Sequence, residues 1–305
     1  MEPDRDVLIT DVVLRDGLQV EPFIVAAEDR VRLGRLLLGA GLGSLEVGAF
    51  VSTRKVPQMT GTDAVLRVLA RDATAVLHTL VFTEFGAQQA VEAGARSVRF
   101  VVSATDGHSR PNAGVTTERA LDRLAPAAEV LRDAGVRIEA CIATAFVCPF
   151  DGDTPPAQVA RTAKRLVRLG AEVVHLADTI GAADPSAITR GVMAVRDAVP
   201  EIPLGLHLHN TNGMASANAW AAFRLGIRRF DAALGGIGGC PFAPGASGNI
   251  ATDDLVHSFH REGVRTGIDP VKLAEARDLL AVVVDHPLHS ALSRTGKPRV
   301  AVGVN

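Results

Sequence analysis

The sequence contains little cysteine, little net charge and no long apolar segment, and each absence excludes a class of protein. Its 305 residues include three cysteines, Cys141, Cys148 and Cys240. Three cysteines are too few for a disulfide scaffold and suit a reducing compartment, so we expect the protein in the cytoplasm. The acidic N-terminal residues do not resemble a signal or transit peptide. The apolar runs are shorter than a membrane span, so we expect no membrane association.

Neither positively nor negatively charged residues are in large excess. The formal net charge is −2, and the lysines and arginines are scattered along the chain. This pattern argues against a nucleic-acid groove, so we expect no nucleic-acid partner. An acidic substrate must therefore be bound by a few placed cations or by a metal. Hydrophobic residues make up 47% of the chain and charged residues 22%, values typical of a folded globular protein.

A repeated pattern organises the chain. Five segments each contain an amphipathic run, a glycine suited to the end of a helix, and about five strand-like residues. The five glycines are Gly41, Gly94, Gly135, Gly170 and Gly226. With three further runs, the expected strands cover residues 7–13, 44–48, 75–81, 97–102, 136–142, 172–176, 203–208 and 229–234. Expected helices between them include residues 28–40, 62–71, 117–134, 157–169, 186–198 and 214–225.

Eight strands alternating with helices predict an α/β fold, a (β/α)₈ TIM barrel with a parallel sheet. A doubly wound open sheet is the alternative, and the absence of a G-x-G-x-x-G motif after the first strand disfavours it. No segment rich in proline, serine or charge separates domains, so we expect one domain over residues 1–305. Residues 268–305 are expected to form a helical C-terminal extension packed on the barrel.

Polar residues concentrate where a TIM barrel has its active site. That site lies at the C-terminal ends of the strands. The opposite ends of the expected strands carry mostly ordinary Gly, Arg and Glu. The candidates at the C-terminal ends are Arg15, Asp16, Gln19, Glu46, Asp178, Thr179, His207, His209, Cys240 and Asn249.

His207 and His209 are two residues apart on one expected strand, so both side chains face the barrel interior. Alone, they could be two core histidines bonded to neighbouring carbonyls, and Asp16 alone could cap the turn that contains it. Together with the amide oxygen of Asn249, however, they form a donor set that favours octahedral Mg²⁺ or Mn²⁺ over tetrahedral zinc. The sequence thus predicts a divalent metal site at Asp16, His207, His209 and Asn249.

Arg15 and Cys240 are the remaining residues that suggest chemistry. Arg15 could form a salt bridge on the barrel rim, or it could direct its guanidinium at a developing oxyanion while Glu46 or Asp178 holds it. Cys240 lies in residues 235–249, which hold six glycines and two prolines. Such a loop can close over a substrate, exclude water and place a thiol. The alternative for Cys240 is a small buried hydrophobe, which its glycine neighbours disfavour.

The motifs as a set resemble the 3-hydroxy-3-methylglutaryl-CoA lyases, a branch of the metal-dependent TIM-barrel lyases and Claisen-condensing enzymes. The resemblance extends from about residue 7 to about residue 295. It rests on RDGLQVE (15–21), EVGAFVSTRKVPQM (46–59), CPFDG (148–152), ADTIG (177–181), HLHNTNGMASAN (207–218) and GGIGGCPFAPGASGNIATDDL (235–255).

This resemblance implies retro-Claisen cleavage of 3-hydroxy-3-methylglutaryl-CoA, or a close 3-hydroxy-3-acyl-CoA analogue, to acetyl-CoA and a 3-oxo acid such as acetoacetate. It also implies a homodimer and a place in leucine degradation. In such an enzyme Arg15 polarises the thioester carbonyl, Cys240 lies in the catalytic loop, and Glu46 and Asp178 are active-site carboxylates. The chemistry needs a base near the metal, either His207 or Asp16 acting through a water. We expect Arg15, Gln19 and Thr179 to contact the substrate.

Three departures from the family pattern leave the substrate open. They are Phe82-Thr83 after the third expected strand, Thr105-Asp106 after the fourth, and Asn210 after the second histidine. None involves the expected metal ligands, so a thioester with a different C3 substituent is compatible with the sequence. One alternative is a condensing enzyme that joins acetyl-CoA to a 2-oxo acid, as isopropylmalate synthases do. Another is a catalytically silent barrel.

Overall fold

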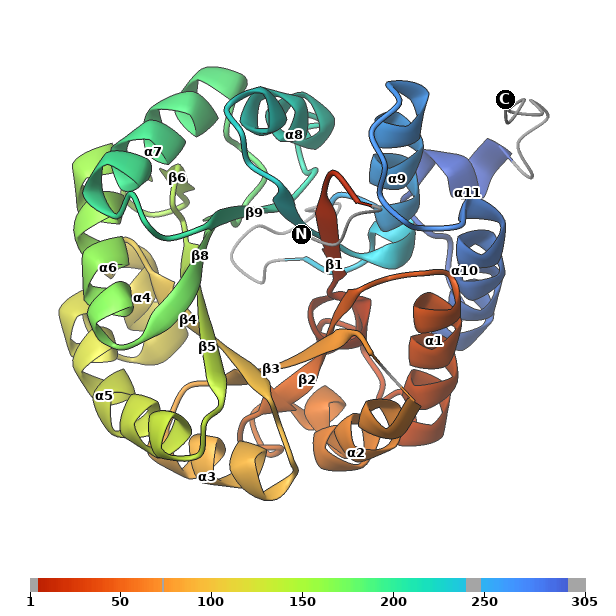
Figure 1. The fold of residues 1–305 in the computed structure, drawn as a ribbon, viewed down its shortest axis with the longest axis horizontal. Coiled ribbons are helices and arrows are strands. Elements are labelled where there is room, and N and C mark those ends of the chain that lie inside the picture. Colours follow the sequence, from red (N-terminus) through yellow and green to blue (C-terminus); the bar gives the residue numbers. More distant parts are fainter. Residues whose placement is uncertain (1–4, 73, 240–247, 296–305) are drawn as a thin grey trace.

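The protein folds as a closed barrel of eight parallel strands surrounded by helices (Figure 1). The computed structural model describes residues 5–72, 74–239 and 248–295. Around the barrel the strands follow the order β1-β10-β9-β8-β5-β4-β3-β2, and β1 pairs with both β10 and β2 to close it. The barrel strands are β1 (Leu8–Asp11), β2 (Ser44–Phe50), β3 (Val76–Val81), β4 (Ser97–Ser103), β5 (Arg137–Ala143), β8 (Ala171–Asp178), β9 (Leu204–Leu208) and β10 (Arg229–Ala232).

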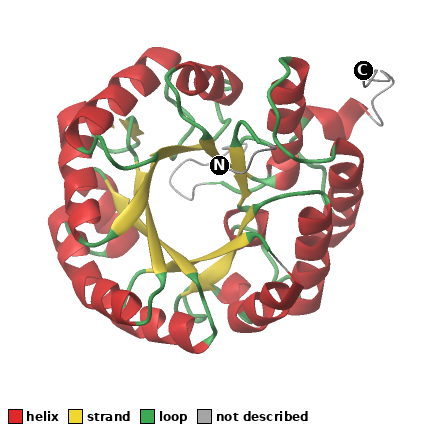
Figure 2. Ribbon diagram, in the orientation of Figure 1, coloured by secondary structure: helices red, strands yellow, loops and turns green. Residues whose placement is uncertain are grey.

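An outer layer of helices covers the barrel, as Figure 2 shows by colour. Each of the five glycines expected at helix ends has a positive φ, between 66° and 99°, a conformation that glycine adopts without steric cost. None of the described helices is long and apolar enough to cross a membrane. The longer helices are α1 (Ala27–Gly39), α2 (Thr62–Asp72), α3 (Glu84–Glu92), α4 (Asp106–Ala113), α5 (Thr117–Asp133), α6 (Pro156–Arg168), α7 (Pro185–Ala198), α8 (Ala215–Arg224), α9 (Thr252–Arg261) and α10 (Pro270–Val284).

The TIM-barrel prediction is confirmed, and all eight expected strands are present. The first strand is shorter than expected, because residues 13–17 leave the sheet as a wide π-type turn, η1 (Val13–Gly17). Helices α3, α4 and α9 and the two-stranded hairpin of β6 (Val147–Cys148) and β7 (Gly152–Asp153) were not among the expected elements. The expected C-terminal helices appear as α10, which packs on α1 and α9, and the short α11 (Ala291–Thr295).

The buried residues form two regions of different composition, one outside the wall of strands and one inside it. Between strands and helices lies a continuous apolar core built largely of Leu, Val, Ile and Ala. Inside the barrel, in contrast, the strands bury a layer of charged and polar side chains. Burial of charge is costly unless each group is paired. The charged members of this layer are Glu46, Arg99, Glu139 and Asp231, and the histidines beside them are His78 and His175.

Candidate active site and metal centre

The turn after β1 presents Arg15 and Asp16 at the C-terminal mouth of the barrel. The carbonyl of Val12 accepts the backbone N–H groups of Asp16 at 2.7 Å and of Gly17 at 3.3 Å. The second bond spans five residues and widens the turn, a feature that recurs at functional sites. A Cβ at Gly17 would lie 2.9 Å from the side chain of Val13 and 3.0 Å from that of Ile237, so the turn packs closely against the segment after β10.

The two histidines and Asn249 are placed by β9 and by a backbone bridge beyond it. His207 lies on β9, and His209 follows the last residue of that strand. The backbone at His209 pairs with that at Asn249, and the N–H of Ile250 donates to the carbonyl of Leu208 at 2.8 Å. Asn249 therefore reaches the site because its segment continues the hydrogen bonding of β9.

Asp16, His207 and His209 converge on one point. Their potential ligand atoms all lie within 4.8 Å of one another. The Nε2 atoms of the two histidines are 3.2 Å apart, and Oδ2 of Asp16 lies 3.6 Å from Nε2 of His209 and 3.9 Å from Nε2 of His207. All three residues are at least mostly buried. The described residues thus bring together three of the four expected metal ligands with their donor atoms facing each other.

The chemistry of this donor set fits a divalent cation. Nδ1 of His207 lies 3.2 Å from Oδ2 of Asp231, so Nδ1 carries the proton and donates it, which leaves a lone pair on Nε2. Nδ1 of His209 has no hydrogen-bond partner among the described residues. This lone pair faces the carboxylate of Asp16 and the imidazole of His209. A cation placed among them would take a donor atom from each, and a carboxylate with imidazoles suits Mg²⁺ or Mn²⁺.

Asn249 lies in contact with this cluster, but through its nitrogen. Its Nδ2 donates to Oδ2 of Asp16 at 2.7 Å and to the carbonyl of Ile237 at 3.2 Å, whereas its buried Oδ1 has no partner among the described residues. A half-turn of the amide would exchange the two atoms, and such assignments follow from the surrounding network. An unpartnered buried oxygen beside the cluster is compatible with a ligand. The metal-binding role of Asn249 remains a prediction.

Arg15 is held between two carboxylates. Its Nε pairs with Oε1 of Glu46, and its NH1 pairs with Oδ1 of Asp16. Burial by itself would raise the pKa of Asp16, but Arg15 and the two histidines outweigh it and hold that pKa well below its usual range. Burial would lower the pKa of Arg15, and Asp16 and Glu46 outweigh it in the opposite direction. Asp16 is therefore anionic and Arg15 cationic, as metal binding and oxyanion stabilisation respectively require.

A cavity of about 160 Å³ opens beside these residues at the C-terminal mouth. Gln19 and Thr179 line it, as expected for substrate-contacting residues, together with Arg15 and both histidines. Phe82 is also in its wall, whereas Thr105 bonds to Cys148 and Asn210 accepts the N–H of Ala215 at the start of α8. Of the three departures from the family pattern, only Phe82 faces the substrate space.

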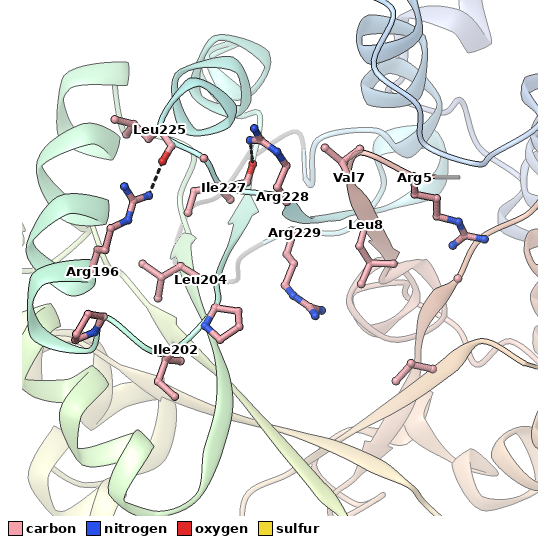
Figure 3. A pocket seen from close by; sticks show the side chains of 15 residues that line it. Arg5, Val7, Leu8, Arg196, Ile202, Leu204, Leu225, Ile227, Arg228 and Arg229 are labelled. Carbon is pink, nitrogen blue, oxygen red and sulfur yellow. Dashed lines mark hydrogen bonds between the residues drawn. The ribbon is translucent and has the colours of Figure 1, made fainter. Parts of the chain in front are cut away.

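A second and larger cavity, about 650 Å³, lies at the opposite end of the barrel (Figure 3). It is bordered by the first residues of several strands, including Leu8, Val76 and Leu204. Figure 3 shows the side chains of Arg5, Arg196, Arg228 and Arg229 around it. Within the part of the chain that the structure describes, no carboxylate, histidine or cysteine lines this cavity. Size alone therefore does not locate the chemistry, and we place the site at the smaller cavity, where the donor groups converge.

Two expected catalytic carboxylates occupy positions next to the site rather than in its wall. Glu46 is fully buried and bonds both Arg15 and Arg99. The carboxylate of Asp178 accepts the backbone N–H groups of Ala182 at 3.0 Å and Ala183 at 3.1 Å, and burial raises its pKa to about 6. Asp178 thus shapes the turn after β8. Its catalytic role remains a prediction, as does that of Cys240, which lies outside the described residues.

The sequence reasoning missed the layer beneath the site. Asp231 orients His207, and Arg99 bonds Asp231 and Glu46. A signal was available, because single charged residues interrupt otherwise apolar stretches of strand in SLEV, SVRF, IEA and FDA. A charge in the middle of a buried strand requires a partner. The identity of each partner could not be read from the sequence, since the pairs are 24 to 132 residues apart.

Comparison with known proteins supplies the family. The family model described as HMGL-like matches residues 6–280, which is most of the chain. The chain belongs to the HMGL-like family. It is a lyase of this family with a TIM-barrel fold, so the resemblance seen in the sequence motifs is confirmed.

Relatives and solved structures cover nearly the whole chain. The protein is 43% identical over 300 residues to the (R)-citramalyl-CoA lyase of Chloroflexus aurantiacus, covering 95% of each chain. It is 40% identical over 271 residues to the hydroxymethylglutaryl-CoA lyase of Pseudomonas mevalonii, covering 88% of this chain and 89% of the relative. Its fold matches the hydroxymethylglutaryl-CoA lyase structure from Pseudomonas aeruginosa with a TM-score of 0.92 and 34% identity, covering 96% and 97% of the two chains.

A further solved structure was determined with ligands. It is an HMG-CoA lyase from Acinetobacter baumannii in complex with coenzyme A and 3-methylmalate, with a TM-score of 0.92 and 35% identity. The comparison covers 100% of this chain and 99% of that one.

Proposed function

We propose that the protein is a divalent-metal-dependent lyase that cleaves a 3-hydroxy-3-acyl-CoA thioester to acetyl-CoA and an oxo acid. The observation that carries this proposal is the convergence of Asp16, His207 and His209 beside Arg15 in one cavity. The relatives named above act on CoA esters, which supports the same substrate class here. The ion is Mg²⁺ or Mn²⁺, bound by these three residues and Asn249. We also propose that the protein is a cytoplasmic homodimer.

The reaction needs three things from the site. The tertiary hydroxyl must lose its proton, the C2–C3 bond must break with its electrons moving into a thioester enolate, and the enolate must regain a proton. A bound divalent ion would acidify the hydroxyl and offset the charge of the substrate carboxylate. Arg15, fixed by Glu46 and Asp16, would offset charge on the enolate oxygen without having to reorganise. Cys240 would deliver the proton that completes acetyl-CoA.

The hydroxyl proton goes to His207 or to Asp16, the same pair that the sequence left open. His207 is suited to it, because Asp231 at Nδ1 would stabilise the imidazolium formed when Nε2 accepts a proton. The same Nε2 is the atom that would bind the ion. One lone pair cannot do both at once, so measurements on His207 variants decide between the roles.

Two substrates are the leading candidates, and they differ by one methylene. In a citramalyl thioester the second carboxyl group lies directly on the carbinol carbon, so cleavage gives pyruvate beside acetyl-CoA. In the 3-hydroxy-3-methylglutaryl thioester a CH₂ intervenes, and the product is acetoacetate. The sequence identity to the citramalyl-CoA lyase, 43%, is higher than the 40% to the hydroxymethylglutaryl-CoA lyase. The citramalyl thioester is therefore a candidate beside the methylglutaryl thioester. If the substrate is the methylglutaryl thioester, leucine degradation is the pathway we propose.

The experiment that tests this proposal measures acetyl-CoA release from both thioesters with Mg²⁺ or Mn²⁺ and after chelation. We expect chelation to abolish cleavage. A methylene is worth about 10- to 200-fold in kcat/KM, so one of the two thioesters should be preferred clearly. No cleavage of either thioester, together with condensation of acetyl-CoA and a 2-oxo acid, would identify a condensing enzyme instead. No reaction in either direction would indicate a silent barrel.

A further inference from the structure

The guanidinium of Arg99 lies next to the candidate site. It contacts Glu46 and Asp231, the carboxylates that hold Arg15 and His207. Arg99, in the middle of β4, is 1% exposed. Its NH1 donates to Oδ2 of Asp231 at 2.7 Å and to Oε2 of Glu46 at 3.2 Å. Its NH2 donates to Oε2 of Glu139 at 3.1 Å. Both terminal nitrogens of Arg99 are thus engaged by carboxylates, although the residue also lines the 160 Å³ cavity.

The two carboxylates that accept hydrogen bonds from NH1 of Arg99 contact different parts of the candidate site. Glu46 uses its other oxygen to bond Nε of Arg15, the proposed oxyanion partner. Asp231 contacts Nδ1 of His207 at 3.2 Å and thereby orients the imidazole. Arg15 comes from the turn after β1 and His207 from β9, and these strands are not neighbours in the barrel, because β10 lies between them. Through two hydrogen bonds from one nitrogen, Arg99 ties them together across the interior.

We propose that Arg99 is a positioning residue that sets the placement of Arg15 relative to His207 before substrate arrives. A planar guanidinium can hold two carboxylates at once with fixed geometry, which a lysine ammonium on a flexible stem cannot reproduce. Asp231, which bonds the proposed ligand His207, is a partner of the kind whose loss changes metal affinity by about 10- to 100-fold, and Arg99 acts through it. Misplacement of a reacting group by about 1 Å costs about 100-fold in rate. This inference rests on the proposed function for its kinetic and Mn²⁺-binding readouts, but not for its structural readout.

Glu139 provides a matched control in the same layer. It is buried like Glu46 and Asp231 and bonds the same guanidinium, but its other contacts are His175 at 3.5 Å and His78 at 3.9 Å. Among the described residues, Glu139 itself forms no hydrogen bond or ion pair with Arg15, His207, Glu46 or Asp231. Glu139→Gln keeps the size and an acceptor oxygen, so a general weakening of the layer should appear in this variant as well as in Arg99→Lys.

The test compares Arg99→Lys with Glu139→Gln in the full chain, after circular dichroism confirms that both fold. We expect Arg99→Lys to lower kcat about 100-fold and Mn²⁺ affinity, measured by electron paramagnetic resonance, about tenfold. Glu139→Gln should change neither by more than about threefold, because it removes no link to either side of the site. Equal losses in the two variants would overturn the proposal, as would wild-type values in Arg99→Lys.

A non-additivity test separates positioning from simple stability. If Arg99 acts through its two partners, then adding Arg99→Lys to the Glu46→Gln, Asp231→Asn double variant should cost little further activity or Mn²⁺ affinity. A full additional loss would contradict the proposal. If wild type neither binds Mn²⁺ nor cleaves thioesters, the proposed function fails. Crystal structures of wild type and Arg99→Lys then still decide, since an unchanged placement of Arg15 and His207 would overturn the positioning role.

Discussion

At the scale of single residues, two neighbours in the sequence, Arg15 and Asp16, have different proposed roles. Arg15 and Asp16 are adjacent and paired, yet Arg15 also contacts Glu46 from β2 and Asp16 also contacts Asn249 after β10. The π-type turn makes this possible, because it aims consecutive side chains into one mouth. Asp16 thus offers an anionic oxygen to the proposed metal site, while Arg15 lines the cavity beside it.

We expect Asp16→Asn to weaken Mn²⁺ binding at least tenfold, since loss of a ligand should cost no less than the roughly 10- to 100-fold seen for residues one step further out. The substitution keeps the size of the side chain and removes the negative charge that faces His207 and His209. Titration calorimetry with Mn²⁺ measures the effect. An unchanged dissociation constant would show that the carboxylate is not a ligand, and Asp106→Asn on the exposed start of α4 serves as the control.

His207→Gln separates the two roles open to that imidazole. If Nε2 binds the ion, Mn²⁺ affinity falls at least about tenfold together with kcat. If Nε2 accepts the hydroxyl proton, Mn²⁺ affinity stays near wild type while kcat falls about 100-fold, the lower end of what general base catalysis contributes. Mn²⁺ titration and kcat measured on the same preparation distinguish these cases. A variant with full activity would exclude both roles.

At the scale of elements, the C-terminal extension contacts the loop that follows the Arg15 turn. His286, after α10, places Nε2 3.1 Å from both oxygens of Glu21, which is 5% exposed. The carbonyl of Pro287 and the carboxylate of Glu21 raise the pKa of His286. The extension is therefore attached to the active-site side of the barrel by a bond that depends on protonation.

The pH dependence of this contact has a defined sign. A histidine whose pKa is raised on folding stabilises the fold fully below its unfolded pKa of about 6.5, and that stabilisation is lost as the pH rises through the folded value. We expect wild type to exceed His286→Gln in unfolding free energy at pH 6, by less than about 1 kcal/mol because the pair is partly exposed, and by less at pH 8.5. Denaturant unfolding at the two pH values measures these free-energy differences. Glu21→Gln should behave like His286→Gln. Unfolding free energies of wild type and variant that change with pH in parallel would contradict the assignment.

Cys240, which lies outside the described residues, is the group that we propose completes product formation. We expect Cys240→Ala to bind Mn²⁺ as wild type does and to lower kcat about 100-fold, because the thiol moves a proton and does not hold the ion. Cys148→Ala is a useful comparison, since Cys148 is a buried thiol on β6 and is not among the described residues that line the 160 Å³ cavity. Full turnover in Cys240→Ala would exclude the thiol as proton donor.

At the scale of the whole molecule, the barrel separates the proposed site from the larger of the two cavities described above. The proposed site occupies the C-terminal mouth, whereas the arginine-lined cavity of Figure 3 lies at the N-terminal ends of the strands. The charged layer of Glu46, Arg99 and Asp231 lies in the interior and contacts the proposed site directly. We therefore expect the substrate to enter at the C-terminal mouth.

Arg229→Met tests this separation. Arg229 begins β10 and lines the larger cavity. Its removal should leave kcat/KM unchanged and shift unfolding free energy by no more than about 0.5 kcal/mol, as for substitutions away from buried networks. Acetyl-CoA release and denaturant unfolding measure the two. A fall in kcat/KM comparable to that of Asp16→Asn would place part of the substrate at this end.

Much of the fold was predictable because its signals are local. Glycine after an amphipathic run marks a helix end, and a short apolar run marks a strand, so the eight strands were found from residue order alone. Helix α4 was missed, since Pro111 and a polar composition hide its pattern. The π-type turn was also missed, because its wide bond to Val12 depends on close packing of Gly17 against Ile237, a residue far along the chain.

The sequence by itself determined the barrel, the end of it that carries chemistry, and the residue types of a divalent metal site. Each of these follows from periodicity or from which side chains stand at strand ends, properties that need no knowledge of distant contacts. Only the tertiary structure decided that Asp178 faces backbone N–H groups, that Glu46 lies behind Arg15, and that Arg99 bonds Asp231. Those arrangements arise when closure of the barrel buries charges that are far apart in sequence, and burial compels each to find a partner.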